Sequence, residues 1–176
     1  MFFRKKIKNM KAMKTIHIGK EDIYTGDPQS IIEPLWYSVS IYEGEEKYNQ
    51  DLQLFSLPQR YIFAIQWYVA EVNNGGHDQF YSNSTGIVWK DALAGFEQIK
   101  HVTAYNILKE SANRLGGSPS MNRDERNNQL DKLNSNFTDL DNAFYKITDL
   151  DDLIMEYIKQ NKKHFYFDSE LKVNNF

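Results

Sequence analysis

Apolar residues recur at helical spacing along most of the chain, and they are densest between residues 59 and 73. Within this run the segment YIFAIQWYVAEV is apolar on almost every side. A helix that is apolar all round belongs in the middle of a bundle. The turn formers Asn73-Asn-Gly-Gly76 end the run before it reaches the ~20 apolar residues that a membrane span needs. We therefore predict a central buried helix at 59–73 and no membrane span.

Shorter amphipathic segments flank this helix. A Ser30-x-x-Glu33 capping box predicts a helix that begins near residues 28–31 and reaches Tyr42. Residues 89–115, with Val102 among the inward positions, predict two helices or one bent helix. The most regular pattern is a seam with spacings of 3 and 4 over about 25 residues from Asn122, and a last helix follows it. These segments predict an all-α, single-domain bundle of about six to eight helices around the central apolar helix.

Composition divides the chain into three parts. Residues 1–26 are a basic leader followed by an extended arm, and we expect them to be flexible. Residues 27–163 are the helical domain. Residues 164–176 are aromatic and polar without a period, so we expect a C-terminal tail. The leader also lacks the apolar run of a secretory signal peptide.

Charge is distributed unevenly along the chain. Residues 1–14 hold six Lys or Arg and no acid, whereas the other 162 residues hold 15 basic and 24 acidic residues, a formal charge of −9. An acidic body repels nucleic acid, so we expect no direct nucleic acid binding by it. The chain contains no cysteine, which excludes a disulfide framework and is compatible with a reducing compartment.

The sequence offers little that is typical of catalysis. Its four histidines are scattered without the spacing of metal ligands, so we expect no metal and no cofactor. His77, Asp78 and Gln79 follow the Gly75-Gly76 turn, and a small enzyme with a pocket at this turn is one hypothesis. Neighbouring residues on a helix point in different directions, however, which argues against a catalytic relay between His77 and Asp78.

The alternative interpretation of the turn is architectural. Paired Gly residues let two helices meet closely. In this interpretation Asn74 and Asn83 satisfy backbone groups at helix ends, and Gln79 bridges buried amides. Phe80 and Tyr81 would fill the core. The structural motif is therefore Asn74, Gly75, Gly76, Gln79, Phe80, Tyr81 and Asn83.

Acidic residues are the second candidate feature. With Leu130 at position a of a heptad, Asp124, Glu125, Asp131 and Asp139 fall on the outward face over about 22 Å of helix, and acids of the last helix extend the row. The candidate partner-binding residues are Asp124, Glu125, Asp131, Asp139, Asp149, Asp151, Asp152 and Glu156. Such a row could stand in for DNA phosphates. The alternative is the ordinary charged surface of a bundle, interrupted here by Arg123, Arg126, Lys132 and Lys146.

The order of these signals resembles the bacterial DNA-mimic protein family. The resemblance rests on Glu71-Val-Asn-Asn-Gly-Gly-His-Asp-Gln-Phe-Tyr-Ser-Asn-Ser-Thr-Gly86, followed by Leu115-Gly-Gly-Ser-Pro119 and Asn122-Arg-Asp-Glu-Arg126. It implies an all-helical, dimeric, cytoplasmic protein without catalysis that engages a basic DNA-binding protein through an acidic surface. An immunity-type interaction protein is a further alternative that the sequence does not separate from this one.

Overall fold

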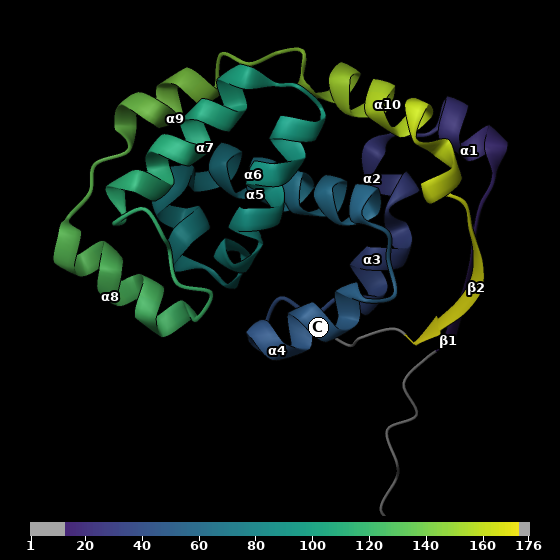
Figure 1. The fold of residues 1–176 in the computed structure, drawn as a ribbon, viewed down its shortest axis with the longest axis horizontal. Coiled ribbons are helices and arrows are strands. Elements are labelled where there is room, and N and C mark those ends of the chain that lie inside the picture. The colour runs from purple at the N-terminus through teal and green to yellow at the C-terminus, as the bar shows by residue number, and fades with distance from the viewer. Residues whose placement is uncertain (1–12, 173–176) are drawn as a thin grey trace, which may run out of the picture.

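The computed structural model describes residues 13–172 (Figure 1). Most of this range is helical, which confirms the expected all-α class. The first twelve residues of the basic leader lie outside the described residues. Within 13–172 the α-helices are α1 (Lys20–Thr25), α2 (Pro28–Ile31), α3 (Glu33–Ser38), α4 (Glu45–Leu52), α5 (Leu57–Ser82), α6 (Trp89–Gln98), α7 (Val102–Arg114), α8 (Arg123–Leu133), α9 (Thr138–Phe144) and α10 (Leu150–Gln160). Two 3-10 turns, Ser84–Val88 and Lys162–His164, and two strands, β1 (Met13–Ile18) and β2 (Phe167–Lys172), complete this range.

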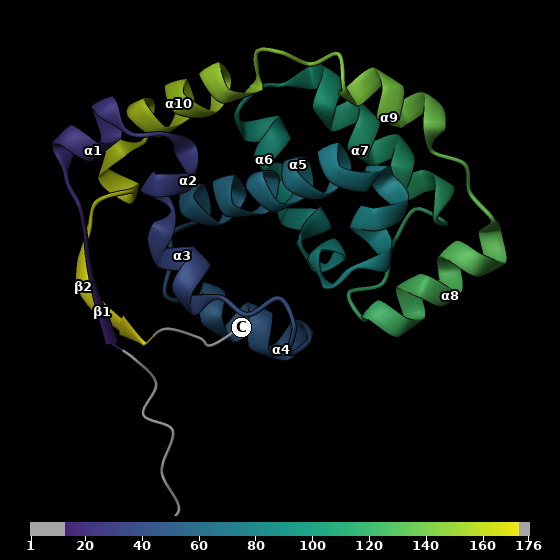
Figure 2. The ribbon, with the colours of Figure 1, turned by 180° about the vertical axis from the view of Figure 1, so that it is seen from behind.

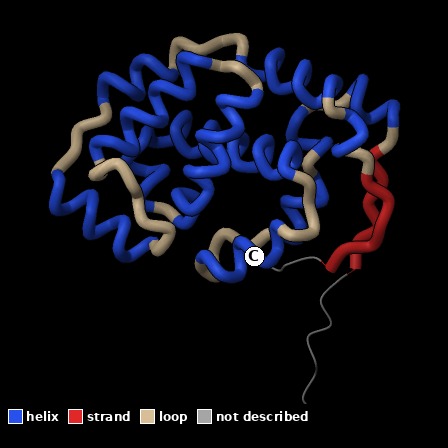
Figure 3. The backbone as a smooth tube through the Cα atoms, in the orientation of Figure 1, coloured by secondary structure: helices blue, strands red, loops and turns tan. Residues whose placement is uncertain are grey.

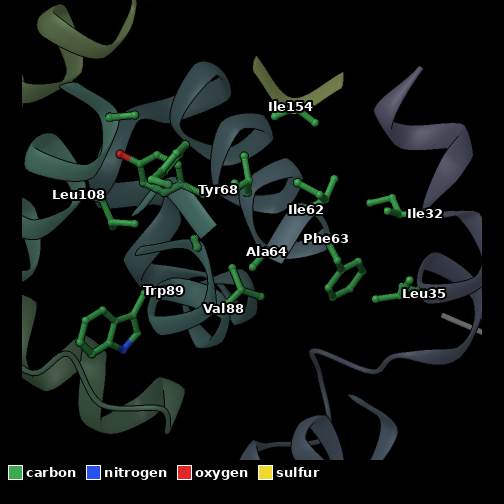
Figure 4. Close-up of a cluster of buried hydrophobic side chains, with 14 of the residues drawn as sticks. Ile32, Leu35, Ile62, Phe63, Ala64, Tyr68, Val88, Trp89, Leu108 and Ile154 are labelled. Carbon is green, nitrogen blue, oxygen red and sulfur yellow. The ribbon is translucent and has the colours of Figure 1, made fainter. Parts of the chain in front are cut away.

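Helix α5 forms the centre of the bundle, as the two opposite views in Figures 1 and 2 show. It begins with a capping box, in which the Ser56 amide donates to Oε1 of Gln59 at 3.0 Å. Four consecutive residues, 62–65, are 0% exposed, so α5 is buried on all sides over this turn, within the apolar run that predicted a buried helix. Figure 4 shows residues from other parts of the bundle around it, among them Leu108 of α7, Ile154 of α10, and Ile32 in the turn between α2 and α3.

The two glycines bend α5 where the turn formers predicted a break. Gly75 has φ −157° and ψ 23°, and Gly76 has φ 72° and ψ −172°. Neither conformation is helical, and the positive φ of Gly76 favours glycine. The helix then resumes and continues to Ser82, so the two glycines kink α5 and do not end it.

The prediction of one long helical seam from Asn122 is wrong, because this segment forms two helices, α8 and α9. Helix α8 ends at Leu133, where Asn134 adopts a left-handed conformation with φ 44°. The Asn136 side chain then accepts from the Thr138 amide at 2.9 Å and starts α9. Leu133 is 45% exposed as a result. The spacing of apolar residues continues across the break, but it serves two separate helix faces.

Two other predicted helices also differ from the structure. The segment after residue 28 divides into α2 and α3, and the capping box lies one turn earlier than predicted, between Asp27 and Ser30. Tyr42 lies beyond α3 and is 59% exposed. Residues 89–115 form two separate helices and not one bent helix, and the sequence had left both forms open. Val102, at the start of α7, was predicted to face inward but is 68% exposed.

The two ends of the described range pair as a small antiparallel sheet, coloured red in Figure 3. Ile16 lies opposite Ser169, and Ile18 lies opposite Phe167. Ile16 and Ile18 are buried, so one face of β1 joins the core. The sequence predicted an extended arm and an aperiodic tail here. It did not predict their pairing, because each strand is short and its partner lies at the other end of the described range.

Within residues 13–172 no helix combines the length and apolar character needed to cross a bilayer. Although α5 is 26 residues long, polar side chains occupy its second half.

Candidate functional site

The kink of α5 holds a buried chain of hydrogen bonds centred on His77. A carboxylate oxygen of Asp141 on α9 accepts from the His77 amide at 2.9 Å and lies 2.5 Å from its Nδ1. On the other side of the ring, the Tyr68 hydroxyl lies 2.8 Å from Nε2. A neutral imidazole satisfies both contacts, since Nδ1–H donates to the carboxylate and Nε2 accepts from the hydroxyl. His77 and Tyr68 are both 0% exposed.

Gly76 makes room for this contact. A Cβ atom added at Gly76 would lie 2.5 Å from Oδ2 of Asp141, which is closer than real Cβ contacts allow. The backbone kink and the approach of α9 therefore depend on the same residue. This explains in physical terms why the turn contains glycine at this position.

Burial controls the protonation of the cluster. It lowers the pKa of His77 below its ordinary value, and the nearby Asp141 carboxylate opposes this shift. Burial also raises the pKa of Tyr68 well above its ordinary value. The cluster thus consists of a neutral histidine and a protonated phenol inside the core.

The three residues of the enzyme hypothesis do not converge on one cleft. His77 points into the core, while Asp78 is exposed. Gln79 donates through Nε2 to the Glu71 carboxylate at 2.6 Å. The orienting carboxylate of His77 is Asp141 and not its neighbour Asp78, which the sequence offered no signal to find.

The structural motif lies around the kink. Phe80 and Tyr81 are 0% exposed, and Asn74 is exposed. Gln79 was expected to bridge buried amides, but its partner is the side chain of Glu71, which also accepts from Nδ2 of Asn83 at 3.0 Å. One carboxylate thus holds the two amide side chains of the motif together.

Arg126 has a different position from the one the sequence suggested. The sequence predicts that Arg126 is an exposed cation that interrupts the acidic face, yet the residue is 0% exposed. Its guanidinium donates to the backbone carbonyls of Tyr81 at 2.6 Å, Asn83 at 2.6 Å and Ser120 at 2.7 Å. The bonds to Tyr81 and Asn83 satisfy carbonyls at the end of α5 and place a positive charge where the helix dipole is negative. Burial lowers the pKa of Arg126 to about 10, so it keeps its charge at neutral pH.

The eight candidate partner-binding carboxylates are all exposed, and we call them the acidic arc. They do not form a straight row on one helix. They are distributed over α8, α9 and α10 and the turn before α10, and these helices follow one another along the outer edge of the bundle in Figures 1 and 2. The arc is therefore curved around the molecule.

Most carboxylates of the acidic arc have no direct cationic partner. Asp139 is the exception, because Arg114 binds it through two nitrogens at 2.6 and 2.8 Å. This pairing lowers the pKa of Asp139 to about 2. Asp149 lies 3.3 Å from Nε2 of His101. Among the described residues, no Lys or Arg nitrogen lies within 4.0 Å of the other seven carboxylates.

A groove with a volume of about 740 Å³ lies between the second half of α5 and α8. It meets the acidic arc at Asp131. Its lining consists of Asp78, Gln79, Ser82, Asn127, Leu130, Asp131, Asn134 and Ser135. In the described part of the chain, no three His, Asp or Glu side chains are grouped as metal ligands, in this groove or elsewhere.

Comparison with known families confirms the family that the sequence resembles. The family model described as DMP19-like protein matches residues 53–161, which is more than half of the chain. The chain belongs to the DMP19-like family. The match contains α5 to α10, and therefore the kink, the groove and the acidic arc, whereas β1, α1 to α4 and β2 lie outside it. Comparison with curated proteins and with solved structures gives no match.

Proposed function

We propose that the acidic arc is a protein-binding surface that occupies the DNA-binding face of a basic partner in place of DNA. The observation that carries the proposal is that seven of its eight exposed carboxylates have no Lys or Arg partner among the described residues. Membership of the DMP19-like family supports the same role.

The electrostatics of the arc favour such a partner. Carboxylates that are not neutralised by their own chain attract the lysines and arginines that a DNA-binding protein uses to contact phosphates. A partner that covers the arc would displace counterions, so binding weakens as salt concentration rises. The arc also has cations of its own, since Arg123, Lys132, Lys146 and Lys159 are exposed on the same helices or between them. The arc therefore selects a partner by the positions of its positive charges as well as by its net charge.

The test is a capture experiment in which DNA releases the partner. The full chain is immobilised, incubated with cell extract at low salt, and washed with a DNA duplex or with sodium chloride at the same ionic strength. A protein that binds the arc through its DNA-binding face should be released from the immobilised chain by the duplex and should remain bound during the salt wash. Failure to recover any protein selectively with DNA would contradict the proposal.

A pair of variants shows whether the arc is the surface involved. The test variant carries Asp151→Asn, Asp152→Asn and Glu156→Gln on α10. The control carries Glu43→Gln, Glu97→Gln and Glu170→Gln, which remove the same charge from exposed acids elsewhere. We expect the test variant to lose most of the DNA-released protein and the control to retain it. Equal losses in both variants would assign the effect to total charge and not to the arc.

A further inference from the structure

The groove between α5 and α8 contains two carboxylates that the protein itself does not neutralise. Asp78 and Asp131 line it, and among the described residues neither has a Lys or Arg nitrogen within 4.0 Å. Neither accepts a hydrogen bond from another described residue. The nearby acids of α9 differ, because Asp139 is bound by Arg114 and Asp141 by His77. The groove therefore keeps negative charge available to an outside cation.

The environment of Asp78 makes its charge costly in the absence of such a cation. Partial burial raises the pKa of Asp78, and the nearby charge of Asp141 raises it further. A cation that entered the groove would offset both effects.

The other residues that line the groove favour a planar hydrogen-bond donor group carried on an apolar chain. Asn127 and Asn134 offer amide oxygens, and Ser82 and Ser135 offer hydroxyls. Leu130 provides an apolar wall. A guanidinium has five donors in a planar fork, and the methylenes of an arginine can lie along apolar surface. An ammonium is a strongly hydrated point charge with three donors and makes less use of these acceptors.

We propose that this groove binds the guanidinium of an arginine side chain of the basic partner. The inference rests on the proposed function, since the same partner covers the acidic arc, and Asp131 belongs to both surfaces. The arc attracts the partner over a distance, and the groove fixes one of its arginines in position. An arginine-selective step would distinguish one basic protein from another, which charge attraction alone does poorly.

The test uses the full chain, labelled with ¹⁵N, and two short peptides, acetyl-Gly-Arg-Gly-amide and acetyl-Gly-Lys-Gly-amide. The side-chain amide signals of Gln79, Asn127 and Asn134 report on the groove directly. We expect the arginine peptide to shift these signals in a saturable way and to bind about fivefold or more tightly than the lysine peptide. Asp78→Asn and Asp131→Asn should each weaken arginine binding by about tenfold.

Two controls separate the groove from general attraction. Glu97→Gln removes the same charge from an exposed acid of α6, outside both the groove and the acidic arc, and should leave arginine binding unchanged. Asn127→Phe fills the groove without changing charge and should abolish the saturable shifts, and thermal unfolding checks that this variant folds. Equal binding of the two peptides, or an equal loss of arginine binding in Glu97→Gln and Asp78→Asn, would overturn the groove assignment.

The capture experiment distinguishes failure of the groove from failure of the proposed function. If the arginine peptide does not bind but DNA still releases a partner from the full chain, the groove assignment is wrong and the proposed function stands. If the peptide binds in the groove but DNA releases no partner, the proposed function is wrong and the groove has another cationic ligand.

Discussion

Nδ1 of His77 lies 2.5 Å from a carboxylate oxygen of Asp141, although 64 residues separate the two in the chain. The contact joins the kink of α5 to α9, the middle helix of the acidic arc. A second bond supports the same junction, because the Tyr145 hydroxyl just after α9 donates to the Val72 carbonyl at 3.0 Å. The surface that we propose to meet a partner is thus fixed to the buried centre of the bundle.

Gly76→Ala should lower the free energy of unfolding by about 3 kcal/mol or more. The positive φ costs an L residue about 1 kcal/mol. The new Cβ would also displace the Asp141 carboxylate and leave buried polar groups of His77 unpaired, at a further cost of about 1–3 kcal/mol. Urea unfolding followed by circular dichroism measures the difference.

Gly44→Ala is the matched control for this prediction. Gly44 has φ 88°, but no atom lies within 4 Å of a Cβ built there. Its substitution should therefore cost only the backbone strain of about 1 kcal/mol. Similar losses in the two variants would show that the contact with Asp141 contributes nothing.

The stability of the protein should fall as pH decreases below the ordinary histidine pKa of 6.5. Because burial lowers the pKa of His77 in the folded state, the unfolded chain binds more protons in this range. The His77 contribution is fully present above pH 6.5, is lost as pH falls, and stops changing below the folded-state pKa. Protonation would put a hydrogen on Nε2, which now accepts from Tyr68.

Urea unfolding at several pH values between 8 and 5 checks this prediction by comparing the wild type with His77→Gln. The free energy of unfolding of the variant should lack the part of the pH dependence that His77 causes. The difference in this free energy between the wild type and the variant should therefore become smaller toward low pH. His17→Gln is the control, since the His17 side chain is 68% exposed. Parallel curves for the wild type and His77→Gln would exclude His77 as the source.

Local signals in the sequence predicted the centre of the fold, but they could not identify contacts between distant segments. The apolar run and the glycine pair are continuous stretches, so α5 and its kink could be predicted. The partner of His77 could not be predicted, because nothing in the sequence separates Asp141 from Asp139, the other acid of α9. The break at Asn134 was missed because the apolar spacing is preserved on both sides of a single left-handed residue.

The same reasoning explains which features of the candidate site could be predicted from the sequence. Exposure of the eight arc carboxylates followed from their outward positions in the pattern, but their arrangement over three helices did not. Arg126 could not be distinguished from a surface cation, because only the fold brings the end of α5 and the loop before α8 to its guanidinium.

Arg126→Met should therefore destabilise the protein by about 3 kcal/mol or more. The substitution keeps much of the side-chain volume but leaves the carbonyls of Tyr81, Asn83 and Ser120 without their donor inside the protein. Arg123→Met is the control, since exposed Arg123 donates through Nε to the Ser82 carbonyl only. It should cost less than about 1 kcal/mol. If Arg126→Met and Arg123→Met unfolded at the same urea concentration, the capping role of Arg126 would be contradicted.

The paired strands at the two ends of the described chain should depend on the core for their stability. A two-stranded sheet is marginal on its own, and β1 is held to the bundle by the buried side chains of Ile16 and Ile18. Ile16→Ala should thus cost about 2 kcal/mol and should reduce the hydrogen-exchange protection of the β2 amides paired with β1. Thr15→Ala, on the exposed face of the same strand, should change stability by less than about 0.5 kcal/mol. If β2 amides kept their protection in Ile16→Ala, β2 would be held by its contacts with α3 and not by its pairing with β1.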